Sequence, residues 1–289
     1  MGYRQRQVWT REKSHMAKVK PFLKWAGSKF RCLDKVLPVF SESYRLIEPF
    51  TGSAAVFLNA NFTEYLLAED NNDLVLLFQC VQEQGLSFIS YCEQFFIPAN
   101  NTPERYYYWR EQFNKCTNVR KRAALFLYLN RHGYNGLCRY NSSGIYNVPF
   151  GRYLKPYFPR AEMQFFALKS QKASIIHSDF RSTMQQATSG DLIYCDPPYA
   201  PLDQTSNFTS YTNKKFGENE QIILAELAVE CAGRGIEVLI SNHDTPFTRH
   251  HYRQGEIFSF PVSRSINCKG NNRYPVRELL AVFRPSRFI

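Results

Sequence analysis

Short apolar runs alternate along the chain with longer segments of helical periodicity. The clearest helical segment is 219–231, where apolar residues recur on one face and Gly233 and Gly235 follow as stop signals. Strands that alternate with helices predict an α/β fold with a mostly parallel sheet, in which ligands bind at the carboxyl ends of the strands. From their length and β-branched content, the expected strands are 45–48, 65–68, 174–177, 192–195, 237–240 and 279–283.

The middle of the chain differs in its charge pattern. From Gln112 to Ala161 there is no Asp or Glu, although the same stretch holds nine Lys and Arg residues. A helix is expected at 121–130, and turn-forming residues follow it. We therefore predict an inserted, mainly helical domain at 85–165, within a catalytic domain formed by 16–84 and 166–289.

Composition narrows the possible functions. Hydrophobic residues make up 44% of the 289, so the chain can form a packed core. Lys and Arg outnumber Asp and Glu by 36 to 25, and the net charge of +11 favours a polyanionic partner, with nucleic acid ahead of an anionic membrane surface. No two of the eight cysteines stand at a C-x-x-C spacing, so we expect no disulfide framework, no zinc site and no other metal.

The apolar runs and the N-terminus indicate a cytoplasmic protein. No apolar run approaches the roughly 18 residues of a membrane span, and the N-terminus lacks an apolar signal region. Residues 1–15 are polar and basic and precede a second methionine, Met16. We expect them to be a disordered extension, an expression artefact or the product of an alternative start.

Asp196-Pro197-Pro198-Tyr199 directly follows the expected strand 192–195 and carries the sharpest chemical signal. An exocyclic amino nitrogen of a nucleobase is a poor nucleophile, because its lone pair is delocalised into the ring. A carboxylate and a backbone carbonyl that accept its two N–H bonds draw the nitrogen toward tetrahedral geometry and free the lone pair. The prolines fix the backbone so that the Pro197 carbonyl can face the base, and Tyr199 offers a ring for stacking. The motif therefore predicts methyl transfer from a sulfonium donor by in-line displacement.

Two further segments combine small and polar residues near the expected strand ends. The run 48–54, Glu-Pro-Phe-Thr-Gly-Ser-Ala, leaves a strand and enters a helix, where backbone N–H groups can approach a ligand. Glu69-Asp70 ends the next strand, at the position where an acid binds ribose hydroxyls in nucleotide-binding sheets. Upstream, the run 22–29, Phe-Leu-Lys-Trp-Ala-Gly-Ser-Lys, places two lysines and a tryptophan in a turn suited to a carboxylate and a flat or cationic group.

Basic, amide and aromatic side chains are interleaved in the segment 130–141 and again in 148–153. Arg suits guanine edges, Asn suits adenine edges, and aromatic or aliphatic tips can enter a base stack. We interpret these segments as a nucleic-acid contact because the surrounding region has no acid; the alternative is a solvated basic loop. Cys195 and His243-Asp244 also stand at strand ends, and we interpret them as structural or pocket-lining residues because no partner for nucleophilic catalysis accompanies them.

From about Pro21 to the C-terminus, the chain resembles the Dam-type DNA adenine-N6 methyltransferases. The motifs that carry the resemblance are FLKWAGSK, EPFTGSAAVFLNA, NRHGYNGLCRYN, NVPFGRY, YCDPPYAPL, NFTSY and VLISNHDT. Their order is that of the alpha group, in which the donor motif comes first, the recognition domain second and DPPY last. The resemblance implies a Rossmann-like, seven-stranded methyltransferase sheet with an inserted, mainly helical DNA-recognition domain. It implies S-adenosylmethionine as donor, S-adenosylhomocysteine as product, and a flipped-out adenine within GATC as acceptor.

The resemblance also implies roles for individual residues. Asp196, Pro197 and Tyr199 hold the target adenine, and Asp196 also borders the donor. The remaining donor pocket consists of Trp25, Lys29, Phe50, Gly52, Glu69, Asp179 and Phe180. Bases are read by Lys24, Leu137, Arg139 and Pro149, and the space of the opened duplex is taken by Tyr134 and Asn135. Phosphate or neighbouring contacts come from Arg131, Asn141 and Arg110.

Two positions depart from the family pattern. The first motif of the family is usually F-x-G-x-G, and here Ala54 replaces the last glycine. The ribose acid is usually Asp, and here Glu69 matches it, with Asp70 adjacent, so the choice between the two acids stays open. Neither departure touches DPPY or the basic segment.

Double-stranded DNA is the expected partner, bound by a monomer with no obligate protein partner, no membrane contact and an association with the nucleoid. Related motifs also serve methylation of cytosine N4, of adenine in RNA and of protein glutamine, so these acceptors remain alternatives. A non-catalytic DNA-binding module is a further alternative, which the intact Asp196 and Tyr199 disfavour.

Overall fold

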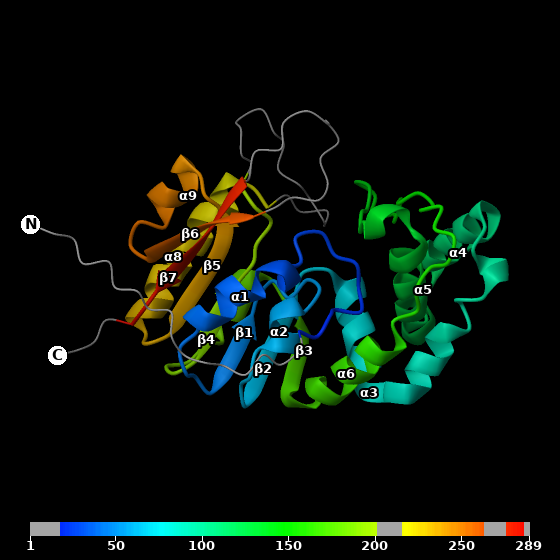
Figure 1. The fold of residues 1–289 in the computed structure, drawn as a ribbon, viewed down its shortest axis with the longest axis horizontal. Coiled ribbons are helices and arrows are strands. Elements are labelled where there is room, and N and C mark those ends of the chain that lie inside the picture. The colour runs from blue at the N-terminus through cyan, green and yellow to red at the C-terminus, as the bar shows by residue number, and fades with distance from the viewer. Residues whose placement is uncertain (1–17, 201–215, 263–275, 286–289) are drawn as a thin grey trace, which may run out of the picture.

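A seven-stranded sheet organises the chain in the computed structural model, which describes residues 18–200, 216–262 and 276–285 (Figure 1). The strands follow the order β3-β2-β1-β4-β5-β7-β6, in which β1 to β5 are parallel and β7 runs antiparallel to both of its neighbours. The predicted α/β fold with a mainly parallel, seven-stranded sheet is therefore confirmed. The strands are β1 Arg45–Glu48, β2 Glu64–Glu69, β3 Ala173–His177, β4 Leu192–Cys195, β5 Glu237–His243, β6 Glu256–Val262 and β7 Val276–Phe283.

The sequence pattern predicts six of these strands and misses β6. Most of the residues of β6 are half-buried, and Pro261 interrupts its apolar run, as suits a strand at the edge of a sheet. β5 is longer than expected, because it continues beyond residue 240 through Ser241 and Asn242, which are fully buried, to His243. Polar residues that extend a buried strand escape a search for apolar runs.

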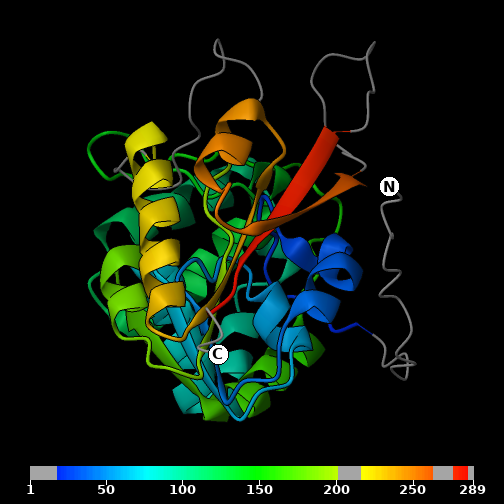
Figure 2. The same ribbon diagram turned by 90° about the vertical axis from the view of Figure 1, so that its left-hand side faces the viewer.

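Side chains alternate between the two faces of the sheet, and a separate apolar cluster covers each face. Leu46, Leu192 and Tyr194 point to one cluster, whereas Ile47 and Ile193 point to the other. Figure 2 shows helix α8 on one side of the sheet and α1 and α2 on the other. The first face is covered by α1 Leu33–Val36, α2 Ala55–Asn59, α3 Asn72–Glu93 and α6 Arg160–Lys169, and the second by α7 Phe180–Gln185 and α8 Glu218–Gly233.

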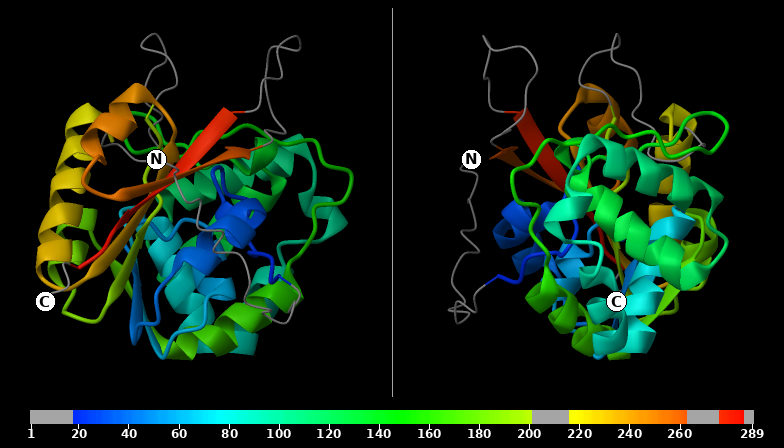
Figure 3. Two further views of the ribbon diagram at one scale, coloured as in Figure 1. Left: turned by 60° about the vertical axis from the view of Figure 1, so that its left-hand side comes forward. Right: turned by 90° about the vertical axis from the view of Figure 1, so that its right-hand side faces the viewer.

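Two further helices, α4 Pro103–Lys115 and α5 Val119–His132, lie beyond β3 at the end of the molecule opposite β6 and β7 (Figures 1 and 3). Side-chain caps begin them, because Thr102 Oγ1 accepts from Arg105 N and Asn118 Oδ1 accepts from Lys121 N. Their apolar side chains belong to the cluster that covers the first face of the sheet. The helical part and the sheet therefore share one continuous core.

The expected boundary of an inserted domain at residue 85 falls at a break in α3. Gly85 has a φ of 50° and a ψ of −126°, values that interrupt the helix and that glycine adopts without strain. The division into 16–84 with 166–289 and 85–165 stays a prediction. Residues 1–15 lie outside the described part of the chain.

The remaining helices are short. Helix α9, Pro246–His251, follows β5 and lies above α8 in Figure 2. The 3-10 helices are η1 Lys29–Cys32, η2 Leu37–Val39, η3 Pro98–Asn100, η4 Tyr134–Gly136 and η5 Ser170–Lys172. Within the described ranges, no helix has the length and apolar character to cross a membrane, and no three His, Cys, Asp or Glu residues are grouped so as to hold a metal.

Candidate active site

The carboxyl ends of β1, β2 and β4 meet at one edge of the sheet. β1 lies between β2 and β4, with Ile47 opposite both Leu66 and Ile193. The chain order reverses at this point, since β2 and β3 extend the sheet on one side and β4 and β5 on the other. Such a switch point is where open parallel sheets bind ligands, and the three segments predicted to hold donor and base leave the sheet here.

Asp196, the first residue after β4, is held by a lysine from the N-terminal segment. Lys29 Nζ lies 2.8 Å from Asp196 Oδ1 and also donates to the Gly27 carbonyl at 2.8 Å. Burial raises the pKa of Asp196 to about 6, although the Lys29 charge acts to lower it. The carboxyl is therefore mainly ionised at neutral pH and can accept N–H bonds.

Tyr199 lies beside the same lysine, and a residue from β7 binds its hydroxyl. The Lys29 ammonium lies 4.5 Å from the centre of the Tyr199 ring, and the Tyr199 hydroxyl donates to Glu278 Oε2 at 3.1 Å. The His243 ring meets the Tyr199 ring edge-on, with centroids 4.7 Å apart. The sequence places Lys29 in the donor pocket, whereas in the structure its ammonium contacts two residues predicted to hold the base, besides the Gly27 carbonyl. Glu278 carries no sequence signal.

A tight turn leads from β1 into α2. Gly52 has a φ of 49°, and a Cβ added there would meet Trp25 Nε1 at 3.0 Å, so Trp25 lies against the turn where glycine leaves space. Ser28 Oγ and Ser53 Oγ are 2.8 Å apart and join the 22–29 segment to this turn. Ala54, which replaces the glycine of the family pattern, has a φ of 61° and a ψ of 26°. It therefore occupies the left-handed conformation that the missing glycine would favour.

Glu69 at the end of β2 faces the same turn. Its Oε2 accepts from Gly52 N at 3.0 Å, and burial raises its pKa to about 7. The Asp70 main-chain carbonyl, in contrast, lies 3.2 Å from His177 Nε2 on β3. The longer arm of Glu69 thus brings its carboxyl group to the glycine turn, and which of the two acids binds ribose stays a prediction.

Three aromatic rings gather beside the turn. Phe50 and Phe180 are stacked with centroids 5.4 Å apart, and Phe216 meets them at 5.5 and 5.6 Å. Asp179 is the N-cap of α7, where its Oδ1 accepts from Arg181 N at 2.9 Å. Phe50 and Phe180 therefore lie in contact, with Asp179 next to Phe180 in the chain, and Phe216, which precedes α8, joins the rings although the motifs do not mark it. The role of these residues toward the donor stays a prediction.

A buried carboxyl at the end of β1 has an atom without a partner. Glu48 is 2% exposed, and among the described residues its Oε1 makes no hydrogen bond. Burial raises its pKa to about 8, and the nearby Asp196 charge acts in the same direction. An unpaired buried oxygen is costly, so this position suits a polar ligand group that completes the missing hydrogen bond.

Lys24 is fixed between the sheet and the segment that follows α5. Asn130 accepts from Lys24 N at 3.0 Å and donates to Lys24 O at 2.7 Å and Gly136 O at 3.3 Å. The Lys24 ammonium lies 3.6 Å from the centre of the Tyr153 ring, and burial lowers its pKa to about 8. Asn130 opens the NRHGYNG motif, but sequence reasoning did not give it a role.

Residues 133–151 form a long loop with little regular structure. Its ends pair at Gly133 and Phe150, and Tyr140 pairs with Tyr146. Tyr134 is 51% exposed, and Asn135, also exposed, has a φ of 52°. The other predicted base readers in the loop are Leu137, which is half-buried, and Arg139 and Pro149, which are exposed. These residues therefore share one loop, and Lys24 packs against the start of that loop.

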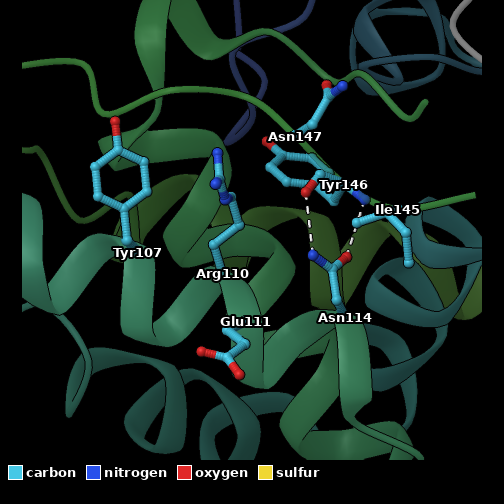
Figure 4. Close-up of a pocket in the computed structure, with 7 residues that line it drawn as sticks. All are labelled: Tyr107, Arg110, Glu111, Asn114, Ile145, Tyr146 and Asn147. Atoms are coloured by element: carbon cyan, nitrogen blue, oxygen red, sulfur yellow. Dashed lines mark hydrogen bonds between the residues drawn. The ribbon is translucent and has the colours of Figure 1, made fainter.

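Asn147 orients Arg139 within this loop. Arg139 Nε donates to Asn147 Oδ1 at 2.7 Å, and Nη2 donates to the Asn147 carbonyl at 3.2 Å. Asn114 of α4 holds the main chain of the adjacent Tyr146 through its N–H and its carbonyl, as Figure 4 shows. The guanidinium is thus supported by Asn147 of the NVPFGRY motif, and the neighbouring Tyr146 is held by Asn114, which lies outside the motifs.

The predicted phosphate contacts have protein partners in the structure. Arg131 is only 9% exposed, and its Nε donates to the Tyr157 carbonyl at 2.9 Å. Asn141 closes a turn by accepting from Ser143 N and Ile145 N. Arg110 Nη1 donates to the Val148 carbonyl at 2.9 Å and lies in a pocket between α4 and the loop (Figure 4), lined by Tyr107, Arg110, Glu111, Asn114, Ile145, Tyr146 and Asn147. Their roles toward DNA stay predictions.

Acids from neighbouring segments neutralise part of the basic stretch. Arg122 pairs with Asp73, which also accepts from the Tyr140 hydroxyl at 2.6 Å. Lys115 pairs with Glu111, and Arg160 pairs with Glu93. The basic residues that are exposed in this stretch are Lys115, Arg139, Arg152 and Lys155. The positive surface is therefore smaller than the acid-free sequence suggests.

Part of the quoted motifs cannot be placed: NFTSY at 207–211 and the final Pro201-Leu202 of YCDPPYAPL lie outside the described residues. The other motifs converge on the sheet edge and the loop 133–151. Cys195 is fully buried, as its interpretation as a structural residue requires, and burial raises its thiol pKa well above the usual value.

Comparison with known proteins agrees with this geometry. Residues 25–266 match the family model of D12 class N6 adenine-specific DNA methyltransferases. A protein of Escherichia coli strain K12 named DNA adenine methylase is 46% identical over 270 residues, which cover 93% of this chain and 97% of that protein. Proteins of the same name are 48% identical in Haemophilus influenzae, covering 92% and 94%, and 45% identical in Vibrio cholerae serotype O1, covering 93% and 98%. The chain therefore belongs to the D12 class of N6 adenine-specific DNA methyltransferases.

Proposed function

We propose that this enzyme transfers a methyl group from S-adenosylmethionine to N6 of an adenine in GATC, after the adenine has left the DNA duplex. One observation carries this proposal: Asp196 and Tyr199 lie at the same sheet edge as the glycine turn after β1. A methyl donor and a base can then meet at a fixed carboxylate. The name of the relatives, DNA adenine methylase, supports duplex DNA as the acceptor, and the Dam-type motifs support GATC.

The residues at the donor side fit an adenosyl sulfonium compound. The space above Gly52, which a Cβ would fill, lies beside Trp25, and Glu69 points its carboxylate to the same turn. The Phe50 and Phe180 rings offer apolar faces for a purine, and Glu48 Oε1 offers an unused acceptor for an amino group. When bound, S-adenosylmethionine supplies an electrophilic methyl group on a positively charged sulfur. Lys29, named for this pocket, contacts Asp196 in the structure.

The residues at the acceptor side activate the amino group. The ionised Asp196 accepts one N–H bond of the adenine, the Pro197 carbonyl accepts the other, and Tyr199 stacks on the ring. Lys29 already donates to Asp196 and lies over Tyr199, so the arriving base has to share or replace these two contacts. No enzyme nucleophile is needed, because the adenine nitrogen itself attacks the methyl group.

DNA recognition is assigned to residues 85–165, which form the proposed inserted domain, together with Lys24. Arg139, Leu137, Pro149 and Lys24 read bases, and Tyr134 with Asn135 at the start of the loop takes the space of the flipped base. Support comes from the exposure of Tyr134, Arg139 and Pro149 and from the link between Lys24 and the loop through Asn130. Arg131, Asn141 and Arg110 are assigned to the phosphates beside the site.

The test is a filter-binding assay with tritiated S-adenosylmethionine and three acceptors: a GATC duplex, a GTTC duplex of otherwise equal sequence, and a structured RNA. We expect label to appear in the GATC duplex alone and to be recovered as N6-methyladenine after digestion. Label in RNA or in N4-methylcytosine would contradict the assigned acceptor. Binding of the GATC duplex without any transfer would contradict the assigned chemistry.

A further inference from the structure

Three side chains, two of them fully buried, hold the main chain of the Asp196–Ala200 segment. Gln221 Nε2 on α8 donates to the Pro198 carbonyl at 2.7 Å. Asn242 Oδ1 on β5 accepts from Ala200 N at 3.0 Å, and His243 Nδ1 lies 2.6 Å from the Ala200 carbonyl. Gln221 and Asn242 are fully buried. The main chain of this segment is thus tied by Gln221, which lies outside the quoted motifs, and by Asn242 and His243, which belong to VLISNHDT but have no role assigned in catalysis.

Elementary hydrogen-bond chemistry fixes the orientation of both amides. The Pro198 carbonyl can only accept, so the Gln221 nitrogen has to face it, and the Ala200 N–H can only donate, so the Asn242 oxygen has to face it. The two remaining atoms then match, because Asn242 Nδ2 donates to Gln221 Oε1 at 2.9 Å. The Tyr252 hydroxyl lies 3.0 Å from Asn242 Nδ2 and donates to Gln221 Oε1 at 3.1 Å. The network is therefore closed and has one arrangement.

The two prolines make such external ties important. Pro197 and Pro198 have no N–H, so the segment cannot secure itself through donors of its own at these positions. Its anchor points are the Pro198 carbonyl and the Ala200 amide, on the two sides of Tyr199. Fixing both leaves the Pro197 carbonyl and the Tyr199 ring little freedom to turn.

We propose that Gln221 and Asn242 are positioning residues that clamp the Pro198–Ala200 main chain, so that the Pro197 carbonyl, Asp196 and Tyr199 receive the adenine in a reactive orientation. The inference rests on the proposed function of Asp196 and Pro197. It predicts that loss of the clamp slows the chemical step and leaves ligand binding intact, because neither residue contacts the surface that DNA reaches. A displacement of about 1 Å in such a site can cost on the order of 10²-fold in rate.

The experiment compares Gln221→Met with Gln82→Met as a matched control. Gln82 on α3 also donates its side-chain amide to main-chain carbonyls, those of Ser170 and Ala173, at the opposite end of the sheet. We expect Gln221→Met to lower the single-turnover methylation rate about 10- to 100-fold, with the Kd values for GATC duplex and donor within about threefold of wild type. Gln82→Met should change the rate less than about threefold. If Gln221→Met does not fold, Gln221→Leu removes the same donor with less bulk.

A second measurement, hydrogen exchange, tests the clamp independently of activity. Asn242→Leu should accelerate hydrogen exchange at the Ala200 amide, which Asn242 Oδ1 binds in the structure, and Gln82→Met should leave that amide unchanged. Unchanged exchange in Asn242→Leu, or equal rate losses in Gln221→Met and Gln82→Met, would overturn the inference. A wild-type protein that transfers no methyl group to GATC would instead overturn the proposed function, and the exchange result would still decide the clamp.

Discussion

The sheet edge around Asp196 and the loop 133–151 are held in different ways. At the sheet edge, parallel strands fix where Glu48, Glu69 and Asp196 leave the sheet, and a closed network of buried groups holds the main chain that follows Asp196. The loop has only two isolated β-bridges and one 3-10 turn, and single side chains such as Asn130 and Asn147 hold it. The proposed chemistry thus depends on the geometry of the whole sheet, whereas the proposed recognition depends on local contacts of single side chains.

Asp196→Ala should separate chemistry from DNA binding most clearly, because it removes the carboxylate that accepts an N–H bond and makes the amino lone pair available. We expect the methylation rate to fall on the order of 10³-fold or more, because the acceptor of a reacting N–H bond is lost. DNA affinity should stay near the wild-type value, since recognition is assigned to the loop. Single-turnover assays and gel-shift titrations with GATC duplex measure the two quantities.

Asp191→Ala is the control at the other end of the same strand, where Asp191 pairs with Arg45. It should lower the free energy of unfolding while leaving the rate of the folded enzyme near that of wild type. Equal losses of DNA binding and rate in Asp196→Ala would contradict the separation of chemistry from recognition.

Arg139→Ala tests the proposed base-reading role of the loop. It should lower the free energy of discrimination between GATC and substituted sites by about 1–3 kcal/mol, because a guanidinium that reads a base edge is lost. The rate on saturating GATC duplex should change little. Competition between GATC and singly substituted duplexes measures this discrimination. Asn147→Ala should give a smaller loss in the same direction, since Asn147 only orients the guanidinium. Unchanged discrimination across all substituted sites would refute the assignment.

The acid side of the pH profile of kcat/KM probes Asp196. The pKa of Asp196 is raised to about 6, chiefly by burial, and the reaction needs its ionised form. We expect kcat/KM to fall about tenfold for each pH unit below this value. Lys29→Met should move the midpoint upward, since the Lys29 charge favours the carboxylate. The control Lys35→Met, which removes an exposed cation beside Asp34, should leave the midpoint of the pH profile unchanged. If Lys29→Met did not move this midpoint either, Asp196 would be excluded as the titrating group.

Sequence reasoning succeeds where one short segment contains the whole signal. Asp196 can be located because an apolar run predicts β4 and the motif begins at the next residue. Glu69 and Gly52 follow from the same rule at two other strands. The left-handed backbone of Ala54 is also accessible in this way, since it stands where the family pattern has glycine.

The residues that sequence reasoning misses act across the fold. Glu278 reaches Tyr199 from β7, Asn130 reaches Lys24 from α5, and Asp73 holds Arg122 and Tyr140 from α3. Such partners are far apart along the chain, so no local spacing marks them. The acid-free stretch misleads for the same reason, because the acids that pair with it lie outside it or at its border.

Ala54→Gly gives the smallest expected effect and compares backbone strain in the two regions. The left-handed conformation costs a residue with a Cβ about 1–2 kcal/mol, and relief of this cost should offset the lost burial of a methyl group, about 0.8 kcal/mol, and the greater freedom of glycine in the unfolded chain. We therefore expect the free energy of unfolding in urea to change by less than about 0.5 kcal/mol. Ala124→Gly, at an equally buried position inside α5, relieves no strain and should destabilise the protein by about 1–2 kcal/mol. Equal losses at the two positions would show that the turn after β1 is unstrained with alanine, and that the departure from the family pattern at residue 54 stabilises the protein.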